Sequence, residues 1–287
     1  MIPHSPISVR PAETKDRNQL ANMLHFESNV HRHLDWRPPL DWLGMEPYMV
    51  AETADNRLVA ALACPPDPPG IAWVRMFATT NQTSVAKAWD MLWEAAHHQL
   101  SEIPNVAVAA IPLQKWFKEL IEKKGFQHIH NVVVLVWDNR KSKLPEKNRE
   151  VIIRAMRRDD LKTIRDIDEA AFGEIWQNSL DAIQLAYKQS AYATIASMNG
   201  TPVGYQISTP SPFGAHLARL AVHPDGQKKG IGFALLNGLQ HHFSGLEHQR
   251  LSVNTQDNNF ASLALYDKAG FVKTEENYPV YQFIFER

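Results

Sequence analysis

The run from Leu217 to Leu236, LARLAVHPDGQKKGIGFALL, constrains the possible folds of this chain more than any other stretch. Its apolar first part predicts a strand over Leu217 to Val222. That strand must end by Pro224, because proline cannot continue the interior of a sheet. The apolar last part predicts a helix over Phe233 to Phe243. The run therefore predicts a strand and a helix joined by a short glycine-rich loop.

The loop itself has the composition of an anion-binding turn. It contains Gly226, Gly230 and Gly232, and it places Lys228 and Lys229 side by side. Glycines let backbone N–H groups converge on a ligand, and the first turn of a helix adds N–H groups that have no partner within the helix. The loop is therefore typical either of a pyrophosphate-binding turn or of a tight strand-to-helix connection.

A second run favours the pyrophosphate-binding turn. Leu251 to Phe271, LSVNTQDNNFASLALYDKAGF, predicts a short strand, a polar turn, a helix and the start of a further strand. With both runs in this order, the region from Glu150 to Arg287 resembles the GNAT superfamily of acyl-CoA-dependent N-acyltransferases. The resemblance is carried by Val222-His223-Pro224, Gln227-Lys228-Lys229-Gly230-Ile231-Gly232, Asn258 or Asn259, Ala261 or Ala264, Leu265-Tyr266 and Gly270-Phe271.

This resemblance implies an α/β (α+β) fold, in which a mixed, mostly antiparallel sheet is flanked by helices and contains a splayed central strand pair. It implies an N-acetyltransferase that transfers acetyl from acetyl-CoA to a primary amine of a small molecule or peptide by direct attack. Two alternatives are an acyl-CoA-binding sensor or scaffold with little turnover, and an acetyltransferase similar to mycothiol synthase, which also has two GNAT domains.

The resemblance also implies roles for individual residues. The pyrophosphate of the cofactor is expected on the backbone of Gln227, Lys228, Lys229, Gly230, Ile231 and Gly232. The pantetheine arm is expected along Leu220, Ala221 and Val222, as an added strand. Tyr266 matches the tyrosine that protonates the leaving thiolate, although it could be a packing aromatic. Asn259 could contact the cofactor, cap the helix, or do both.

No general base stands out from the sequence. His216 lies at the start of the predicted splayed strand and titrates in a useful range, so it is our candidate, and Glu174 is a weaker one. We expect no metal, because His31-x-His33, His97-His98 and His241-His242 lack a convergent third ligand.

The chain also contains an internal repeat. Arg10 matches Arg154, Gly70 matches Gly214 and Gly125 matches Gly270, at offsets of 144, 144 and 145 residues. We therefore predict two tandem GNAT-like domains, 1–138 and 150–287, joined by a polar linker, 139–149. The first domain is predicted to be degenerate, since Thr83, Ala86 and Ala88 align with Gln227, Gly230 and Gly232, and Ile121 aligns with Tyr266. The alternative is a divergent active site.

One segment of the first half admits two interpretations. Leu34 to Tyr48 contains Trp36 and Trp42 among prolines, where GNAT proteins often have an acceptor-binding loop. It could instead be a surface loop that packs its own aromatic side chains.

Composition adds limits on the class of protein. The 287 residues are 44% hydrophobic and 21% charged with a net charge of −1, so we expect a globular protein with no general affinity for nucleic acid or membranes. The single cysteine, Cys64, and the absence of a signal-like N-terminus favour a cytoplasmic location. The chain is expected to be a monomer or a homodimer, and the acceptor amine cannot be named from the sequence.

Overall fold

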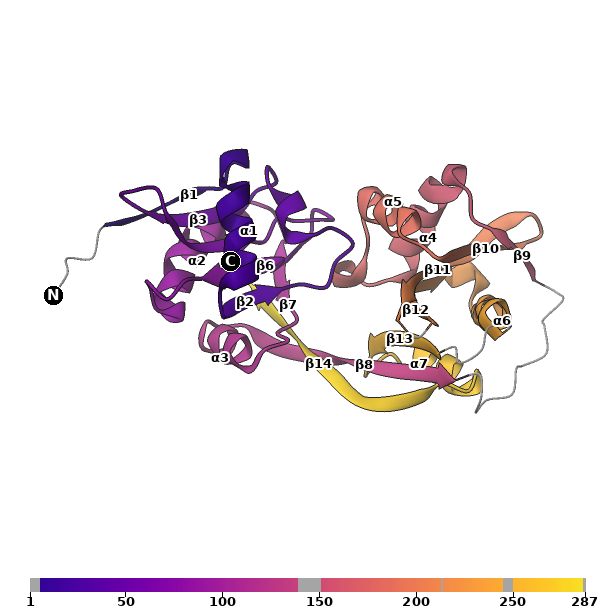
Figure 1. Cartoon of the computed structure of the whole chain (residues 1–287). Helices are drawn as coiled ribbons and strands as arrows, with labels where there is room; N and C mark the ends of the chain where they lie inside the picture. The colour runs from indigo at the N-terminus through magenta and orange to yellow at the C-terminus, as the bar shows by residue number, and fades with distance from the viewer. Residues whose placement is uncertain (1–5, 139–150, 213, 245–249, 286–287) are drawn as a thin grey trace. The chain divides into compact units, whose positions relative to one another are not determined.

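The computed structural model describes residues 6–138, 151–212, 214–244 and 250–285, which form two compact units (Figure 1). One unit comprises residues 1–129 and 279–287, and the other comprises residues 130–278. The predicted linker 139–149 lies outside the described residues. The units also differ from the ranges 1–138 and 150–287, since each contains a terminal strand from the other half of the sequence.

The first unit has two sheets with helices packed on them. One sheet has the order β1-β3-β4-β6-β2, and the other strands, β5-β7-β14, are one end of a nine-stranded sheet. The elements are β1 (Ile7–Pro11), α1 (Arg17–Phe26), β2 (Asn29–Arg32), β3 (Tyr48–Thr53), β4 (Leu58–Ala63), β5 (Ile71–Trp73), β6 (Met76–Thr79), α2 (Val85–Ser101), β7 (Ala107–Ala110) and α3 (Lys115–Lys123).

The second unit is built on a mixed, mostly antiparallel sheet of order β14-β8-β13-β12-β11-β10-β9, in which β12 and β13 are parallel. This arrangement confirms the predicted fold class. Its elements are β8 (Gln127–Asp138), β9 (Ile152–Ala155), α4 (Leu161–Ala171), α5 (Leu180–Lys188), β10 (Tyr192–Met198), β11 (Thr201–Ser211), β12 (Gly214–Val222), α6 (Ile231–Ser244), β13 (Arg250–Gln256), α7 (Phe260–Lys268) and β14 (Val272–Ile284).

Helices cover both faces of this second sheet (Figure 1). A Cβ atom on Gly204 of β11 would lie 3.2 Å from Ile231 of α6, so this residue faces α6. Its neighbour Tyr205 points the other way and donates a hydrogen bond to Asp168 of α4. The helix α7 lies on the α6 side, where Gln240 donates to the carbonyl of Ala269 at 2.7 Å. The sheet therefore has an α4 face and an α6 face.

The strands β10 and β11 form a hairpin around Asn199-Gly200. Asn199 and Gly200 have φ values of 51° and 80°, and the two strands pair antiparallel around them. Positive φ at both central residues defines the type I′ turn that the Asn-Gly pair favours.

Local structure recurs at the spacing of the sequence repeat. Arg10 makes a bidentate pair with Asp16 at 2.7 and 2.9 Å, and Arg154 makes the same pair with Asp160 at 2.7 and 2.7 Å. The ends of α3 and α7 also match. Gly125 and Gly270 have φ values of 86° and 81°, and each following phenylalanine N–H returns to a carbonyl five residues earlier, as in a Schellman C-cap.

The two halves of the sequence exchange their last strands. The strand β8 follows α3, but its residues 132–138 pair with β13 of the second unit. The strand β14 follows α7, yet its residues 281–284 pair with β7 of the first unit. Trp137 of β8 is completely buried in the same hydrophobic cluster as Leu217, Leu251 and Tyr266. Neither unit therefore completes its core from its own half of the sequence.

We expect Trp137→Ala to destabilise the second unit, although Trp137 lies in the N-terminal half. Removing a buried tryptophan side chain costs about 3–5 kcal/mol. Hydrogen exchange should become faster in β13 and remain unchanged in β7. Gln127→Ala, at the exposed first position of β8, is the matched control. Faster exchange in β7 with an unchanged β13 would show that β8 supports the first unit instead.

Candidate functional site

The central feature of the second unit is a strand pair that diverges. The strand β12 pairs with β13 only from Gly214 to Leu217, whereas it pairs with β11 along its whole length. In the β11 ladder, Ile207 pairs with Arg219 and Ser208 pairs with Leu217, so Ala218 is an extra, bulged residue. Beyond the bulge, the β13-facing edge of Leu220, Ala221 and Val222 has no strand partner among the described residues. The structure thus contains the splayed pair that the sequence predicts.

The bulge also changes which side chains face which helices. Before it, Ala215 and Leu217 pack in the cluster formed with α6 and α7. After it, Leu220 and Val222 face α6, where they surround the Cα of Gly232. Arg219 points to α4. By alternation along the strand, His216 and Arg219 lie on the same face, on either side of the bulge.

The loop after β12 is a tight turn with two residues in the left-handed region. Pro224–Gly226 form a short 3-10 helix, then Lys228 has φ of 59° and Gly230 has φ of 77°. The Gln227 side chain donates to the carbonyl of Val222 at 3.1 Å and so ties the turn to the strand end. The helix α6 begins at Ile231, two residues before the expected Phe233.

This turn leaves a row of backbone donors available. The N–H of Gln227 already donates to the carbonyl of Pro224, at 3.1 Å. The next five N–H groups donate to no described residue; they belong to Lys228, Lys229, Gly230, Ile231 and Gly232. They lie at the positive end of the α6 dipole, where an anion is favoured.

Positive side chains and close packing complete the cradle. Lys228 and Lys229 are exposed, and the ammonium of Lys268 lies 4.9 Å from the centre of the Phe233 ring in the first turn of α6. A Cβ on Gly232 would lie 3.3 Å from Leu265 of α7, so a glycine fits best where the two helices meet. The residues present therefore suit a pyrophosphate held by backbone N–H groups.

Tyr266 is buried on α7, with its ring centre 5.7 Å from that of Phe271. It belongs to the cluster that contains Leu217 and Val253, the last residues of β12 and β13 to pair before the strands diverge. Its hydroxyl makes no hydrogen bond with the described residues. Burial raises the pKa of the phenol, so it is protonated at neutral pH. Packing and proton donation are compatible at this position.

The other candidate residues are placed differently. His216 Nδ1 lies 2.9 Å from the hydroxyl of Ser252 on β13, and burial lowers the pKa of the imidazole. Asn259 caps α7, since its Oδ1 accepts from the N–H of Ser262 at 3.2 Å. Glu174 lies exposed on the α4–α5 loop.

The corresponding space in the first unit is filled by aromatic rings. Phe77 stands 144 residues before Ala221, and Phe117 stands 145 residues before Ser262. Both are fully buried, with Trp89 packed against them at centroid distances of 5.2 and 5.9 Å. His31 stacks on Phe117 at 3.9 Å, and its burial lowers its pKa to about 3. Small side chains of the second unit are thus replaced by large ones.

The helix that corresponds to α6 is also capped by its own chain. The hydroxyl of Ser84 accepts from the N–H of Lys87 at 3.3 Å, at the start of α2. One of the donors that an anion would need is therefore already used. The aromatic segment 34–48 packs inward as well, with Trp42 and Tyr48 buried in a cluster with α1.

A buried polar network on the α4 face was not predicted from the sequence. Asp168 of α4 accepts two hydrogen bonds from Arg219 at 2.7 Å each, and a third from the hydroxyl of Tyr205. One signal could have identified it. Arg75 stands 144 residues before Arg219, so an arginine recurs at this position of the repeat.

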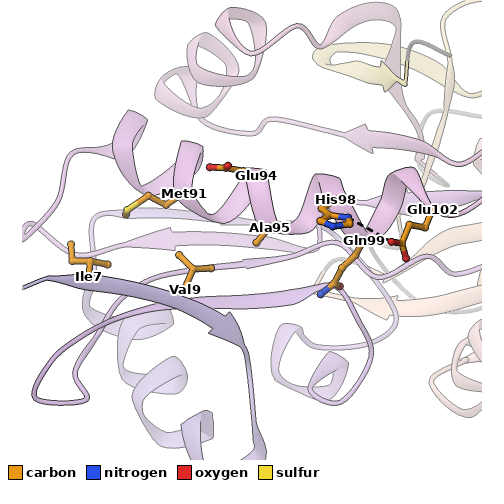
Figure 2. Close-up of a pocket in the computed structure, with 8 residues that line it drawn as sticks. All are labelled: Ile7, Val9, Met91, Glu94, Ala95, His98, Gln99 and Glu102. Atoms are coloured by element: carbon orange, nitrogen blue, oxygen red, sulfur yellow. Dashed lines mark ion pairs between the residues drawn. The ribbon is translucent and has the colours of Figure 1, made fainter.

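A pocket in the first unit lies between β1 and α2. Figure 2 shows Ile7 and Val9 of β1 pointing toward Met91 and Ala95 of α2, with Glu94, His98 and Glu102 along the helix. The His98 and Glu102 side chains, 3.7 Å apart, are largely exposed. Nothing in this lining converges on a ligand atom, so the pocket reflects helix-on-sheet packing.

The described part of the chain contains no group of three or more His, Cys, Asp or Glu side chains arranged to hold a metal ion. Within the same residues, no helix is both long enough and apolar enough to span a membrane.

Comparison with known proteins agrees with this geometry. Residues 161–271 match the model of the acetyltransferase (GNAT) family. UPF0157 protein YqkA of Bacillus subtilis (strain 168) is 46% identical over 59 residues, which are 21% of this chain and 17% of that protein. The chain therefore spans less than a fifth of the length of that relative.

Solved structures resemble the whole chain. A GCN5-related N-acetyltransferase from Sphaerobacter thermophilus has a TM-score of 0.61 at 14% identity, covering 98% of this chain and 96% of that one. A tandem GNAT protein from the clavulanic acid biosynthesis pathway has a TM-score of 0.64 at 14% identity, covering 97% and 98%. At these identities the likeness concerns the fold alone. Taken together, residues 161–271 match the acetyltransferase (GNAT) family, and the whole chain has the fold of tandem GNAT proteins.

Proposed function

We propose that the chain is an N-acetyltransferase whose second unit binds acetyl-CoA and transfers its acetyl group to a primary amine of a small molecule or peptide. The observation that carries this proposal is the row of five N–H groups at Lys228–Gly232 that donate to no described residue, next to the open edge of β12. A diphosphate on the turn and an extended arm along Leu220–Val222 would use both sets of donors and acceptors. The match of residues 161–271 to the acetyltransferase (GNAT) family supports the same cosubstrate.

The arrangement gives the two substrates different approaches to the gap between β12 and β13. The phosphate turn lies at the start of α6, so the cosubstrate is expected on the α6 side. An arm that runs back along β12 from Val222 brings its acyl end to the bulge at Ala218. His216 and Arg219 lie there on the α4 face, which is where we place the amine.

The reaction needs no covalent enzyme intermediate. The amine nitrogen attacks the thioester carbonyl carbon, a C–N bond forms, and the C–S bond breaks. The hydroxyl of Tyr266 gives its proton to the departing thiolate and is reprotonated from solvent, and the proton lost by the amine passes to solvent or to His216. Burial favours both roles, since it keeps the phenol protonated and the imidazole neutral at neutral pH.

Turnover is the direct test of this proposal. The full chain is incubated with acetyl-CoA and a panel of amines, such as spermidine, glucosamine and a dipeptide with a free α-amine, and CoA release is followed with a thiol reagent. We expect release that depends on one class of amine. Tight acetyl-CoA binding without turnover on any amine would favour the alternative, an acyl-CoA-binding sensor or scaffold.

Gly230→Val should weaken acetyl-CoA binding. Its φ of 77° is strained for a β-branched residue, so the turn must change shape and its N–H groups lose their alignment. We expect the dissociation constant to rise by about 10- to 100-fold in calorimetry.

The control is Gly44→Val in the first unit. Gly44 has φ of 89°, and no atom lies within 4 Å of an added Cβ, so the local strain is similar. That variant should bind acetyl-CoA as the wild type does. Equal losses in both variants would mean that general destabilisation, and not the turn, lowers the affinity.

Tyr266→Phe should lower kcat by about 100-fold and leave acetyl-CoA affinity nearly unchanged, because the thiolate develops charge only as the C–S bond breaks. Tyr192→Phe is the control, since Tyr192 is a partly buried tyrosine of the same unit that stacks on His242. Steady-state kinetics on any accepted amine measures both. Wild-type kcat in Tyr266→Phe would identify Tyr266 as a packing residue only.

A further inference from the structure

Arg219 lies immediately after the bulge of β12 and is held by a buried carboxylate. Its Nε and Nη2 each donate to Asp168 at 2.7 Å, and Asp168 is fully buried. The hydroxyl of Tyr205 donates to the same carboxylate. Burial disfavours the charged guanidinium, but the neighbouring Asp168 carboxylate outweighs this and raises the pKa of Arg219, so the ion pair persists.

The same pair holds the loop between α4 and α5, residues 172–178, at three points. Arg219 Nη2 donates to the carbonyl of Trp176 at 2.5 Å, and Asp168 Oδ1 accepts from the N–H of Asn178 at 2.9 Å. At the start of the loop, the guanidinium carbon lies 3.5 Å from the centre of the Phe172 ring. The loop is therefore anchored by the Arg219–Asp168 pair, through Arg219 at Phe172 and Trp176 and through Asp168 at Asn178.

The position of Arg219 in β12 places the anchored loop beside the candidate site. Arg219 directly precedes the open edge Leu220–Val222 and shares the α4 face with His216. If the arm of acetyl-CoA follows that edge, as the proposed function requires, its acyl end arrives beside the anchored loop. The loop then borders the space from which the amine attacks.

The first unit contains a similar arginine that anchors a loop, but it lacks the glycine turn that would bind the cofactor. Arg75, 144 residues earlier, pairs with Asp35 at 2.8 Å, and its guanidinium carbon lies 4.4 Å from the centre of the Trp42 ring. It thereby holds the segment 34–48, as Arg219 holds 172–178. An arginine that recurs beside a space filled by aromatic rings is a loop anchor and not a reacting group.

We propose that Arg219 is a positioning residue that holds the loop 172–178 as the acceptor-binding wall of the active site. It acts through Asp168 and the backbone of the loop. The planar guanidinium suits this task, since one fork satisfies a carboxylate and a carbonyl at once. The proposal rests on the proposed function, because the loop can border an acceptor site only if the chain acetylates an amine.

The test uses Asp168→Asn in the full chain, which keeps the shape of the side chain and removes its charge. Hydrogen exchange at residues 173–178 should become about tenfold faster or more, because the loop loses its anchor. The dissociation constant of acetyl-CoA should stay within about twofold. The KM for the best amine of the panel should rise about tenfold, with a smaller change in kcat.

Two further variants make the result specific. Asp160→Asn breaks a bidentate pair of the same kind, with Arg154, in the same unit. It should change neither the exchange of the loop nor the KM for the amine. Tyr205→Phe removes one hydrogen bond to Asp168 without changing charge. It should make hydrogen exchange of the loop faster and raise the KM for the amine, each by less than Asp168→Asn does. It replaces Asp168→Asn if that variant does not fold.

Three outcomes would overturn the proposal. Unchanged loop exchange in Asp168→Asn would show that the pair does not anchor the loop. Faster exchange with an unchanged KM for the amine would show that the loop is not the acceptor wall. A rise in the acetyl-CoA dissociation constant as large as the rise in KM would assign the anchor to the cosubstrate side. Failure of the proposed function is distinct, because it appears as inactivity of the wild type on every amine.

Discussion

The bulge at Ala218 is the constraint on which the candidate site depends. Because β12 carries one extra residue there, it leaves β13 after Leu217 and keeps an unpaired edge over its last residues. The same residue reverses the alternation of side chains, so that Arg219 faces α4 while Leu220 faces α6. A regular ladder would close the edge and place each of these side chains on the face opposite to the one it occupies here. One inserted residue thus produces both the unpaired edge of β12 and the arrangement of side chains on the α4 and α6 faces beside it.

The two units show how the same topology can be open or filled. In the second unit, Ala221 and Ser262 are small, and the N–H groups of residues 228–232 before and at the start of α6 donate to no described residue. In the first unit, Phe77 and Phe117 occupy the matching positions, and Ser84 caps the helix. Buried aromatic rings stabilise a fold by removing apolar surface from water, but they leave no room for an extended ligand. Exchange of β8 and β14 also makes each unit depend on strands from both halves of the sequence.

Local features of this fold could be predicted from the sequence, and non-local ones could not. The Asn199-Gly200 hairpin and the glycine turn after β12 depend on neighbouring residues, and the repeat offset follows from comparing the sequence with itself. The strand exchange was missed because β8 and β14 have equivalent sequence positions, so periodicity cannot choose between their partners. The anchor was missed because Asp168 stands 51 residues before Arg219 on another element. Lys228 shows a different limit, since only the folded turn reveals that a lysine has a φ of 59°.

We infer that one unit of the chain is open to acyl-CoA and that the other is filled. Calorimetric titration of the full chain with acetyl-CoA measures this, because the stoichiometry counts the sites without any need for an acceptor. We expect one site per chain, with heat that fits a single binding constant. Two equivalent sites per chain would show that both units are open, since the rings of Phe77, Trp89 and Phe117 would then have to make room for a second cosubstrate.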